Sequence, residues 1–245
     1  MIATYSGEIP YLTTEQMIEV DRAMMEDFRI DLIQMMENAG RALALVACER
    51  FLESDPKGRR VSVLAGTGGN GGGALVAARR LHGWGAKVHV FVTKPIEGFT
   101  PVPAHQLDIL YRMNVPVDQA AGVTDSEAPD IVLDGVIGYS LRGAPRSEAA
   151  RLIRWANSQS APVLALDAPS GVDTTTGQVF DPAVRATATM TLALPKDGLR
   201  APGVESHVGE LYLADISVPP ALYSNKLLGL SVGPIFSAGD IVRLR

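Results

Sequence analysis

The stretch Ala65-Gly66-Thr67-Gly68-Gly69-Asn70-Gly71-Gly72-Gly73-Ala74 decides the fold, because it joins a buried strand to a helix. Residues 60–65 form an apolar run typical of a strand, and residues 72–84 have helical spacing. Six glycines between positions 66 and 73 would let the backbone take positive φ and approach a ligand closely. The helix that follows offers unpaired N–H groups to an anion. We therefore predict a phosphate-binding loop here, in preference to a merely flexible turn.

Strands and helices alternate after this loop. We predict strands over 60–65, 87–93, 131–134, 162–167, 187–194 and 210–216, and helices over 72–84, 103–113 and 147–158. Two further helices come first, over 15–27 and 32–52, with Thr13 or Thr14 capping the earlier one. Such alternation predicts the α/β class: a three-layer αβα, Rossmann-like fold with a mostly parallel sheet. We expect residues 1–245 to form one domain, with the helices of 13–52 packed on the αβα core.

Composition and charge exclude several classes of protein. The net charge of −5 argues against a general affinity for nucleic acid. The single cysteine, Cys48, cannot form an internal disulfide, and no Cys/His cluster suggests zinc. There is no signal-peptide pattern and no apolar run long enough to span a membrane. We expect a cytoplasmic protein with neither nucleic acid nor membrane as a partner.

Two predicted strands end in a carboxylate. Asp134 follows Ile131-Val132-Leu133, where it serves either as a cap for the next loop or as a ligand contact. Asp167 closes the strand before the turn Pro169-Ser170-Gly171. The alternative to a ligand site is a turn that is stabilised by hydrogen bonds of the aspartate side chains. Because parallel strands deliver their carboxyl ends to one edge, we favour a shared, oxygen-rich site.

The pattern Gly66-x-Gly68-x-x-Gly71 also invites an NAD(P)-dependent oxidoreductase interpretation. That fold places an acidic residue at the end of the second strand, to bind the ribose. Here the strand ends in Val92-Thr93-Lys94, without a carboxylate. The oxidoreductase interpretation is weaker for that reason, and a purely scaffolding protein would not need so polar a set of strand ends.

Several segments, in this order and spacing, resemble the NAD(P)H-hydrate epimerase family, the YjeF N-terminal domain, over about residues 11–219. They are Met36-Glu37-Asn38-Ala39-Gly40-Arg41-Ala42, the glycine loop, Val76-Ala77-Ala78-Arg79, Asp167-x-Pro169-Ser170-Gly171-x-Asp173, Leu194-Pro195-Lys196, Gly198-Leu199, Gly209-Glu210-Leu211 and Asp215-Ile216 with Pro219.

The resemblance implies a metabolite-repair isomerase, often a homodimer. Its substrate would be NADH or NADPH hydrated at C6 of the nicotinamide ring, and it would interconvert the two C6 epimers. A dehydratase, which repairs the hydrate, is fused to this domain in some members. The present sequence is too short to hold both, so we expect a separate dehydratase as the functional partner.

The resemblance also implies site residues. Asp167 would be the catalytic proton-transfer group. A potassium ion would be held by Asn70, Asp134 and Ser170. The substrate would contact Asp167 and two loops: Gly69, Asn70, Gly71, Gly72 and Gly73 in the first, and Gly138, Tyr139, Ser140, Leu141, Arg142, Gly143 and Ala144 in the second.

One departure from the family pattern lies in the glycine loop. Where the family has Asn-Asn-Gly-Gly-Asp-Gly, this chain has Gly69-Asn70-Gly71-Gly72-Gly73-Ala74. The second asparagine remains as Asn70, whereas the aspartate is replaced by Gly73. The alternative to an epimerase is therefore a catalytically inactive nucleotide-binding module of the same fold.

Overall fold

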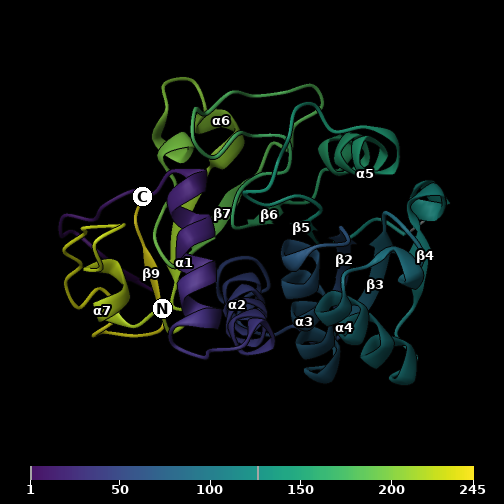
Figure 1. Ribbon diagram of the computed structural model, residues 1–245. Coiled ribbons are helices and arrows are strands. Elements are labelled where there is room, and N and C mark those ends of the chain that lie inside the picture. Colours follow the sequence, from purple (N-terminus) through teal and green to yellow (C-terminus); the bar gives the residue numbers. More distant parts are fainter. Residues whose placement is uncertain (1, 126) are drawn as a thin grey trace.

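The computed structural model describes residues 2–125 and 127–245, and within them the chain forms one nine-stranded sheet in the order β1-β9-β8-β7-β6-β5-β2-β3-β4 (Figure 1). β8 and β9 pair antiparallel, and the other paired strands run parallel. The predicted mostly parallel α/β sheet is confirmed. The strands are β1 (Ala3–Thr4), β2 (Arg60–Ala65), β3 (Lys87–Val92), β4 (Val117–Gln119), β5 (Ile131–Gly135), β6 (Val163–Leu166), β7 (Ala188–Leu192), β8 (Glu210–Ala214) and β9 (Ile241–Arg243).

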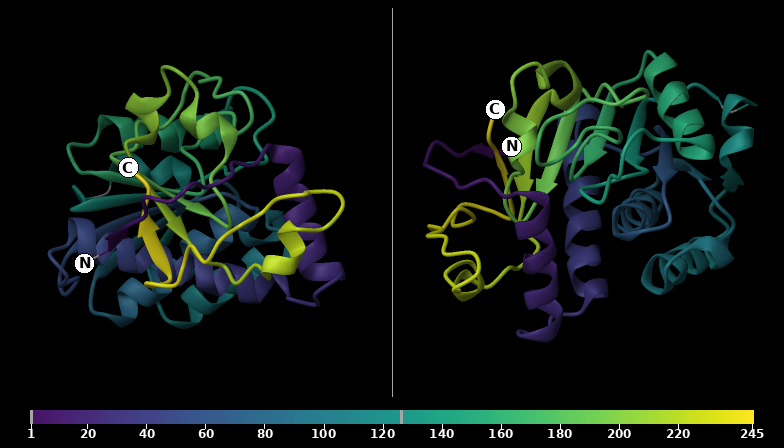
Figure 2. Two further views of the ribbon diagram at one scale, coloured as in Figure 1. Left: turned by 90° about the vertical axis from the view of Figure 1, so that its left-hand side faces the viewer. Right: turned by 45° about the horizontal axis from the view of Figure 1, so that its top comes forward.

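Helices cover both faces of the sheet, which makes three layers (Figure 1 and the left view of Figure 2). One face carries α2, α3 and α4, and the other carries α5 and α6. α1 lies beside α2. The helices are α1 (Thr14–Glu26), α2 (Leu32–Val46), α3 (Gly69–Gly83), α4 (Pro101–Arg112), α5 (Ser147–Ser158), α6 (Glu205–Val208) and α7 (Pro220–Tyr223).

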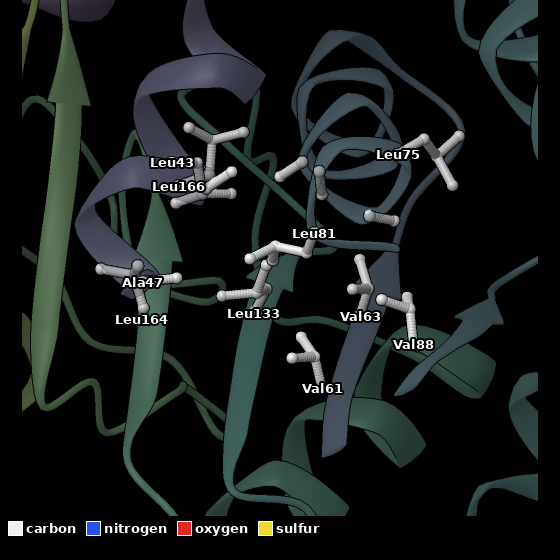
Figure 3. Packing of buried hydrophobic residues seen from close by; sticks show 14 of the residues in the cluster. Leu43, Ala47, Val61, Val63, Leu75, Leu81, Val88, Leu133, Leu164 and Leu166 are labelled. Atoms are coloured by element: carbon white, nitrogen blue, oxygen red, sulfur yellow. The ribbon is translucent and has the colours of Figure 1, made fainter. Parts of the chain in front are cut away.

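The main core lies between the sheet and the face of α2, α3 and α4. Leu43, Leu75 and Leu81 from the helices meet Val63 and Leu133 from the strands (Figure 3). On the opposite face, a second cluster joins the other sides of β2, β3 and β5 to α5. The strands are apolar on both faces because both faces are covered.

The strand order reverses beside β2. From β2 the chain goes by α3 to β3 on one side, whereas β5 pairs on the other side. Ligands in open α/β sheets bind beyond the carboxyl ends of the strands at such a reversal. The turn after β2 and the ends of β5 and β6 are therefore neighbours on one edge.

The first two helices follow the sequence signals closely. The Thr13 side chain accepts a hydrogen bond from the backbone N–H of Gln16, and the Gln16 side chain accepts one from the backbone N–H of Thr13. These two hydrogen bonds form a capping box. Two methionines of α1 and α2, Met17 and Met35, share an apolar cluster with Leu213 of β8. α2 continues as one π-helical turn over Ala47–Phe51. Across the described ranges, no helix is long and apolar enough to cross a membrane.

Candidate functional site

A cavity of about 490 Å³ opens at the carboxyl edge of the sheet, between α1, α2 and the ends of β5, β6 and β7. Its walls are mostly apolar, and a few polar groups converge on it, which is typical of a small-molecule site. The apolar lining comes from Met17, Ile18, Met25, Leu32, Met35, Met36, Ala39, Leu166, Leu192 and Ile216. The rest comes from Asp21, Arg22, Glu26, Gly69, Asn70, Gly138, Tyr139, Ser140 and Asp167.

Four of the glycines after β2 are required by close packing, not by backbone conformation: they are Gly66, Gly71, Gly72 and Gly73, whereas Gly68 and Gly69 have open space around them. None of the six glycines between 66 and 73, all within the described residues, has a positive φ, so that expectation is wrong. A Cβ on Gly66 would collide with the Val136 carbonyl, and one on Gly71 with the Gly66 carbonyl. Gly72 packs against the Met36 sulfur in the same way. The helix also begins at Gly69, three residues before the predicted start.

The exposed start of α3 points at the cavity, and the later glycines do not. Gly69 and Asn70 line the cavity, whereas Gly71, Gly72 and Gly73 are buried. The first N–H groups of a helix have no partner within the helix. An anion seated beside Gly69 would therefore meet free donors and the positive end of a 15-residue helix.

The replaced loop position, Gly73, lies in the packing between helix and sheet. A Cβ there would come within 2.8 Å of the Leu166 Cδ2 atom, and Gly73 is not among the cavity-lining residues. Ala74 is helical and fully buried, so the absence of glycine there distorts nothing. The altered loop is thus matched to its neighbours and leaves the cavity open.

Asp134 of β5 is fully buried, and neither it nor Ser170 is among the cavity-lining residues. Its Oδ2 accepts from the Ser170 amide at 2.8 Å, and its Oδ1 lies 2.7 Å from the Ser170 hydroxyl. Ser170 Oγ also accepts from the Ile137 amide at 2.8 Å, so the two turns after β5 and β6 are tied together. Burial raises the pKa of Asp134 to about 6, against the opposing effect of the Ser170 hydrogen bonds.

Asp167 follows β6 directly and faces the cavity, and the two predicted carboxylates do lie on the same edge of the sheet. Its backbone has φ +65°, a strained conformation that aspartate tolerates better than most residues. Its Oδ1 accepts a short hydrogen bond from Nζ of Lys196, which is itself fully buried. Lys196 also donates to the Leu192 carbonyl at 2.8 Å and to Thr191 Oγ1 at 3.2 Å. Lys196 therefore balances the charge of the Asp167 carboxylate and fixes its orientation.

The predicted second loop is only partly at the cavity. Gly138, Tyr139 and Ser140 line it, and the Asn70 side chain packs against Gly138. The remaining predicted contacts of this loop are not among the lining residues: they are Leu141, Arg142, Gly143 and Ala144.

Sequence reasoning missed two groups at this site. Lys196 was noted only as part of a motif, and Asp21 not at all. The Tyr139 hydroxyl donates a short hydrogen bond to Asp21 Oδ2, although 118 residues separate them. Only the structure joins such distant positions, since Asp21 on its own is an ordinary polar residue of an amphipathic helix.

Within the described residues, no group of three or more His, Cys, Asp or Glu side chains could hold a metal ion. The oxygen atoms at the cavity instead come from carboxylates and from neutral amide and hydroxyl groups.

Comparisons with known proteins agree with the fold. The YjeF-related protein N-terminus family matches residues 32–198. The crystal structure of the yeast protein ynu0 superposes with a TM-score of 0.78 at 24% identity, over 96% of this chain and 100% of that chain.

Curated relatives include separate and fused proteins. An NAD(P)H-hydrate epimerase of Dehalogenimonas lykanthroporepellens is 43% identical over 95% of this chain and 92% of its own length. A bifunctional NAD(P)H-hydrate repair enzyme Nnr of Pyrobaculum aerophilum is 36% identical over 85% of this chain. That match spans 42% of the bifunctional relative.

Proposed function

Because this chain belongs to the YjeF-related protein N-terminus family, we infer that it is an NAD(P)H-hydrate epimerase, an isomerase of metabolite repair. It interconverts the two epimers of NADH or NADPH that carry a hydroxyl at C6 of the nicotinamide ring. The observation that carries the proposal is a carboxylate, Asp167, held at the edge of an apolar cavity beside the first turn of a helix. The 43% identity with a named epimerase over nearly the full chain supports the same activity.

The reaction needs proton transfer to the leaving hydroxyl and from the entering water. C6 carries a hydroxyl and a ring nitrogen, so when the hydroxyl is protonated the C–O bond breaks, water leaves, and the nitrogen lone pair forms an iminium ion. Water then adds to C6 from the other face and loses a proton. We propose that Asp167 takes part in these proton transfers, with Lys196 as a positioning residue that orients the carboxylate.

The substrate's other parts have matching surroundings. We propose that its phosphates lie against Gly69 and Asn70, the two predicted residues of the glycine loop that line the cavity, where the start of α3 offers N–H donors. The loop Gly138 to Ala144 would close over the same region. The apolar walls formed by Met17, Met35 and Leu192 suit the uncharged, hydrated ring.

We further propose that potassium binds between Asn70, Asp134 and Ser170. The Asp134 carboxylate is fully buried, and within the described residues no Lys, Arg or His lies within ion-pair distance of it. Asn70 has a buried amide nitrogen without a partner, and rotating the amide would turn its oxygen inward instead. Oxygen ligands of this kind suit a hard cation, which would compensate the buried charge and order the two turns.

We propose three properties of the protein in its cell. A separate dehydratase would complete the repair, because relatives of about twice the length combine two activities in one chain.

The protein would act in the cytoplasm, where Cys48 stays an inert thiol since burial raises its pKa to about 11. It would be a homodimer, for which the exposed apolar residues Ile18, Met25 and Phe28 of α1 and the turn after it are available. Light scattering at two concentrations tests the dimer.

The activity is tested by incubating the protein with one pure epimer and following conversion by chromatography. We expect Asp167→Asn to lower kcat by about 10²- to 10⁴-fold, because a positioned acid or base contributes that much. The matched control is Asp108→Asn, an exposed carboxylate of α4 that is paired with Arg112, and it should leave kcat unchanged. Wild-type protein that leaves the epimers unconverted would refute the proposal.

A further inference from the structure

A second carboxylate reaches the cavity from helix α1. Asp21 lies on α1, lines the cavity, and accepts a short hydrogen bond from the Tyr139 hydroxyl. Asp167 reaches the same cavity from the end of β6. Two carboxylates on different elements thus face one space of about 490 Å³.

The surroundings of the two carboxylates differ. Asp167 is paired with the buried ammonium of Lys196. Within the residues that the structure describes, Asp21 has no cation at ion-pair distance, and Tyr139 is its only hydrogen-bond donor among side chains. Other charged or titratable groups face Asp21 from α1 itself and from the strand ends across the cavity: they are Arg22, Glu26, Tyr139, Asp167 and Lys196.

These surroundings suit the two carboxylates to different roles. Burial is the largest effect on Asp21 and raises its pKa, with the negative charge of Asp167 adding to the rise. The Tyr139 hydrogen bond and the Lys196 charge oppose it. An aspartate whose pKa is raised by burial, facing the same cavity as a carboxylate that is paired with an ammonium, is an arrangement in which one group can act as acid and the other as base.

Epimerisation calls for such a pair. The leaving oxygen departs from one face of C6, and the entering water arrives at the other. A single carboxylate on one side of the ring reaches only one of these oxygens at hydrogen-bonding distance.

We propose that Asp21, supported by Tyr139, is a second catalytic residue, which transfers the proton on the face of C6 opposite to Asp167. The inference rests on the proposed epimerase function. With one epimer, Asp21 gives its proton to the hydroxyl, the C6–O bond breaks and water leaves. The ring nitrogen forms the iminium ion, water adds from the other side, and Asp167 takes its proton. The other epimer uses the same groups in exchanged roles, so no proton is gained or lost.

The first test uses ¹⁸O-labelled water and each pure epimer in turn, with products separated by chromatography and weighed by mass spectrometry. Asp21→Asn keeps an acceptor for Tyr139 and removes the proton donor. We expect its epimerisation to fall by about 10²-fold or more. Exchange of ¹⁸O should continue, without inversion, in the one epimer whose hydroxyl faces Asp167. Asp167→Asn should show the reciprocal pattern and exchange only the other epimer.

The second test uses Tyr139→Phe, which keeps the ring in the cavity wall and removes only the hydroxyl. Because the Tyr139 hydrogen bond lowers the pKa of Asp21, its removal should move the alkaline limb of the kcat/KM profile to higher pH. A purely structural role for Tyr139 would leave that limb in place. Glu15→Gln, exposed in the first turn of the same helix, is the matched control and should have the wild-type profile.

The outcomes separate the two proposals. If wild-type protein does not epimerise either substrate, the proposed function fails and the inference with it. If Asp167→Asn is inactive while Asp21→Asn converts both epimers at the wild-type rate, the function stands and the second catalytic group is refuted. Exchange confined to the same epimer in both variants would also refute it, because the two groups would then serve one face.

Discussion

At the scale of single residues, Gly73 shows how a lost side chain can be accommodated by packing. The position is buried, and the Leu166 side chain fills the space into which a Cβ would project. We predict that Gly73→Asp lowers the free energy of unfolding by about 1–3 kcal/mol, because it overpacks this contact and buries a polar group. Urea unfolding of the purified variant measures the change.

The control for Gly73→Asp is Gly69→Ala in the same helix. Gly69 has open space around its Cβ position and no positive φ, so the substitution should change the unfolding free energy little. Combining Gly73→Asp with Leu166→Ala should cost less than the sum of the two single substitutions if the contact is the cause. Full wild-type stability of Gly73→Asp alone would show that the loop position is free.

The residue scale also shows what sequence reasoning reached. The carboxylates Asp134 and Asp167 were found because each ends an apolar strand, and parallel strands bring such ends together. The packing demand on Gly66 and Gly71 was mistaken for a demand on φ, since a glycine in the sequence does not say which freedom it supplies. The pairs Asp167–Lys196 and Asp21–Tyr139 join residues 29 and 118 positions apart, which no local pattern encodes.

At the scale of elements, an ion pair joins the turn after α2 to β8. Arg50 donates to both carboxylate oxygens of Glu210, with the shortest contact at 2.8 Å, and the Tyr212 hydroxyl donates at 2.6 Å. The Arg50 guanidinium is the main reason that the pKa of Glu210 falls to about 2. The folded state therefore holds this carboxylate ionised well below the ordinary pKa of about 4.3.

We predict that Glu210→Gln lowers the unfolding free energy by about 1 kcal/mol at pH 7, a modest value because Arg50 is 45% exposed. A depressed pKa in the folded state stabilises it above the unfolded-state pKa, and this stability is lost as the pH falls toward about 2. The difference in unfolding free energy between variant and wild type should therefore shrink as the pH falls from about 4.3 toward about 2. Urea unfolding at several pH values measures it.

The matched control for the ion pair is Glu53→Gln. Glu53 pairs with Arg59 at 2.7 Å, but its side chain is 84% exposed, so its removal should cost little at any pH. A Glu210→Gln effect that persists undiminished at pH 2 would show that packing, not charge, joins the turn to β8.

The longer elements were predictable and the short ones were not. The helix over Ser147–Ser158 has its predicted bounds, since its apolar residues recur at helical spacing. The strand over Arg60–Ala65 does too, because its apolar run ends in glycines. β1, β4 and β9 hold two or three residues each, too few for a period to be seen. They exist because a neighbouring strand offers its edge.

At the scale of the whole molecule, the tail after Tyr223 is built into the fold. It carries β9, which pairs with β8 and with β1. Leu228, Ile235 and Val242 from the tail are buried in the cluster that also holds Met17 and Met35 beside the cavity. No sequence pattern predicts this, because the apolar residues of the tail are interrupted by three glycines and one proline and follow no helical or strand period.

We predict that Val242→Asp lowers the unfolding free energy by more than about 3 kcal/mol, since it places an unpaired charge in that cluster. Its unfolding should stay a single transition by near- and far-ultraviolet circular dichroism, as expected if residues 1–245 form one domain. Leu227→Asp, at a side chain of the same tail that is 71% exposed, is the control and should be nearly neutral. Separate melting of the tail would contradict the one-domain prediction.

The pairing of Ala3 with Val242 places the first and the last strand of the described chain side by side, about 4.8 Å apart, and because they run parallel the two chain ends point in opposite directions along them. A linking peptide long enough to run back along these strands would join the ends, and the exposed turn at Gly58, before β2, would accept a new opening. In such a circular permutant, β2 and the glycine turn would be synthesised first and α1 late. Each strand would still pair with the same neighbouring strands in the sheet. The order of the chain is thus one of several that this architecture permits.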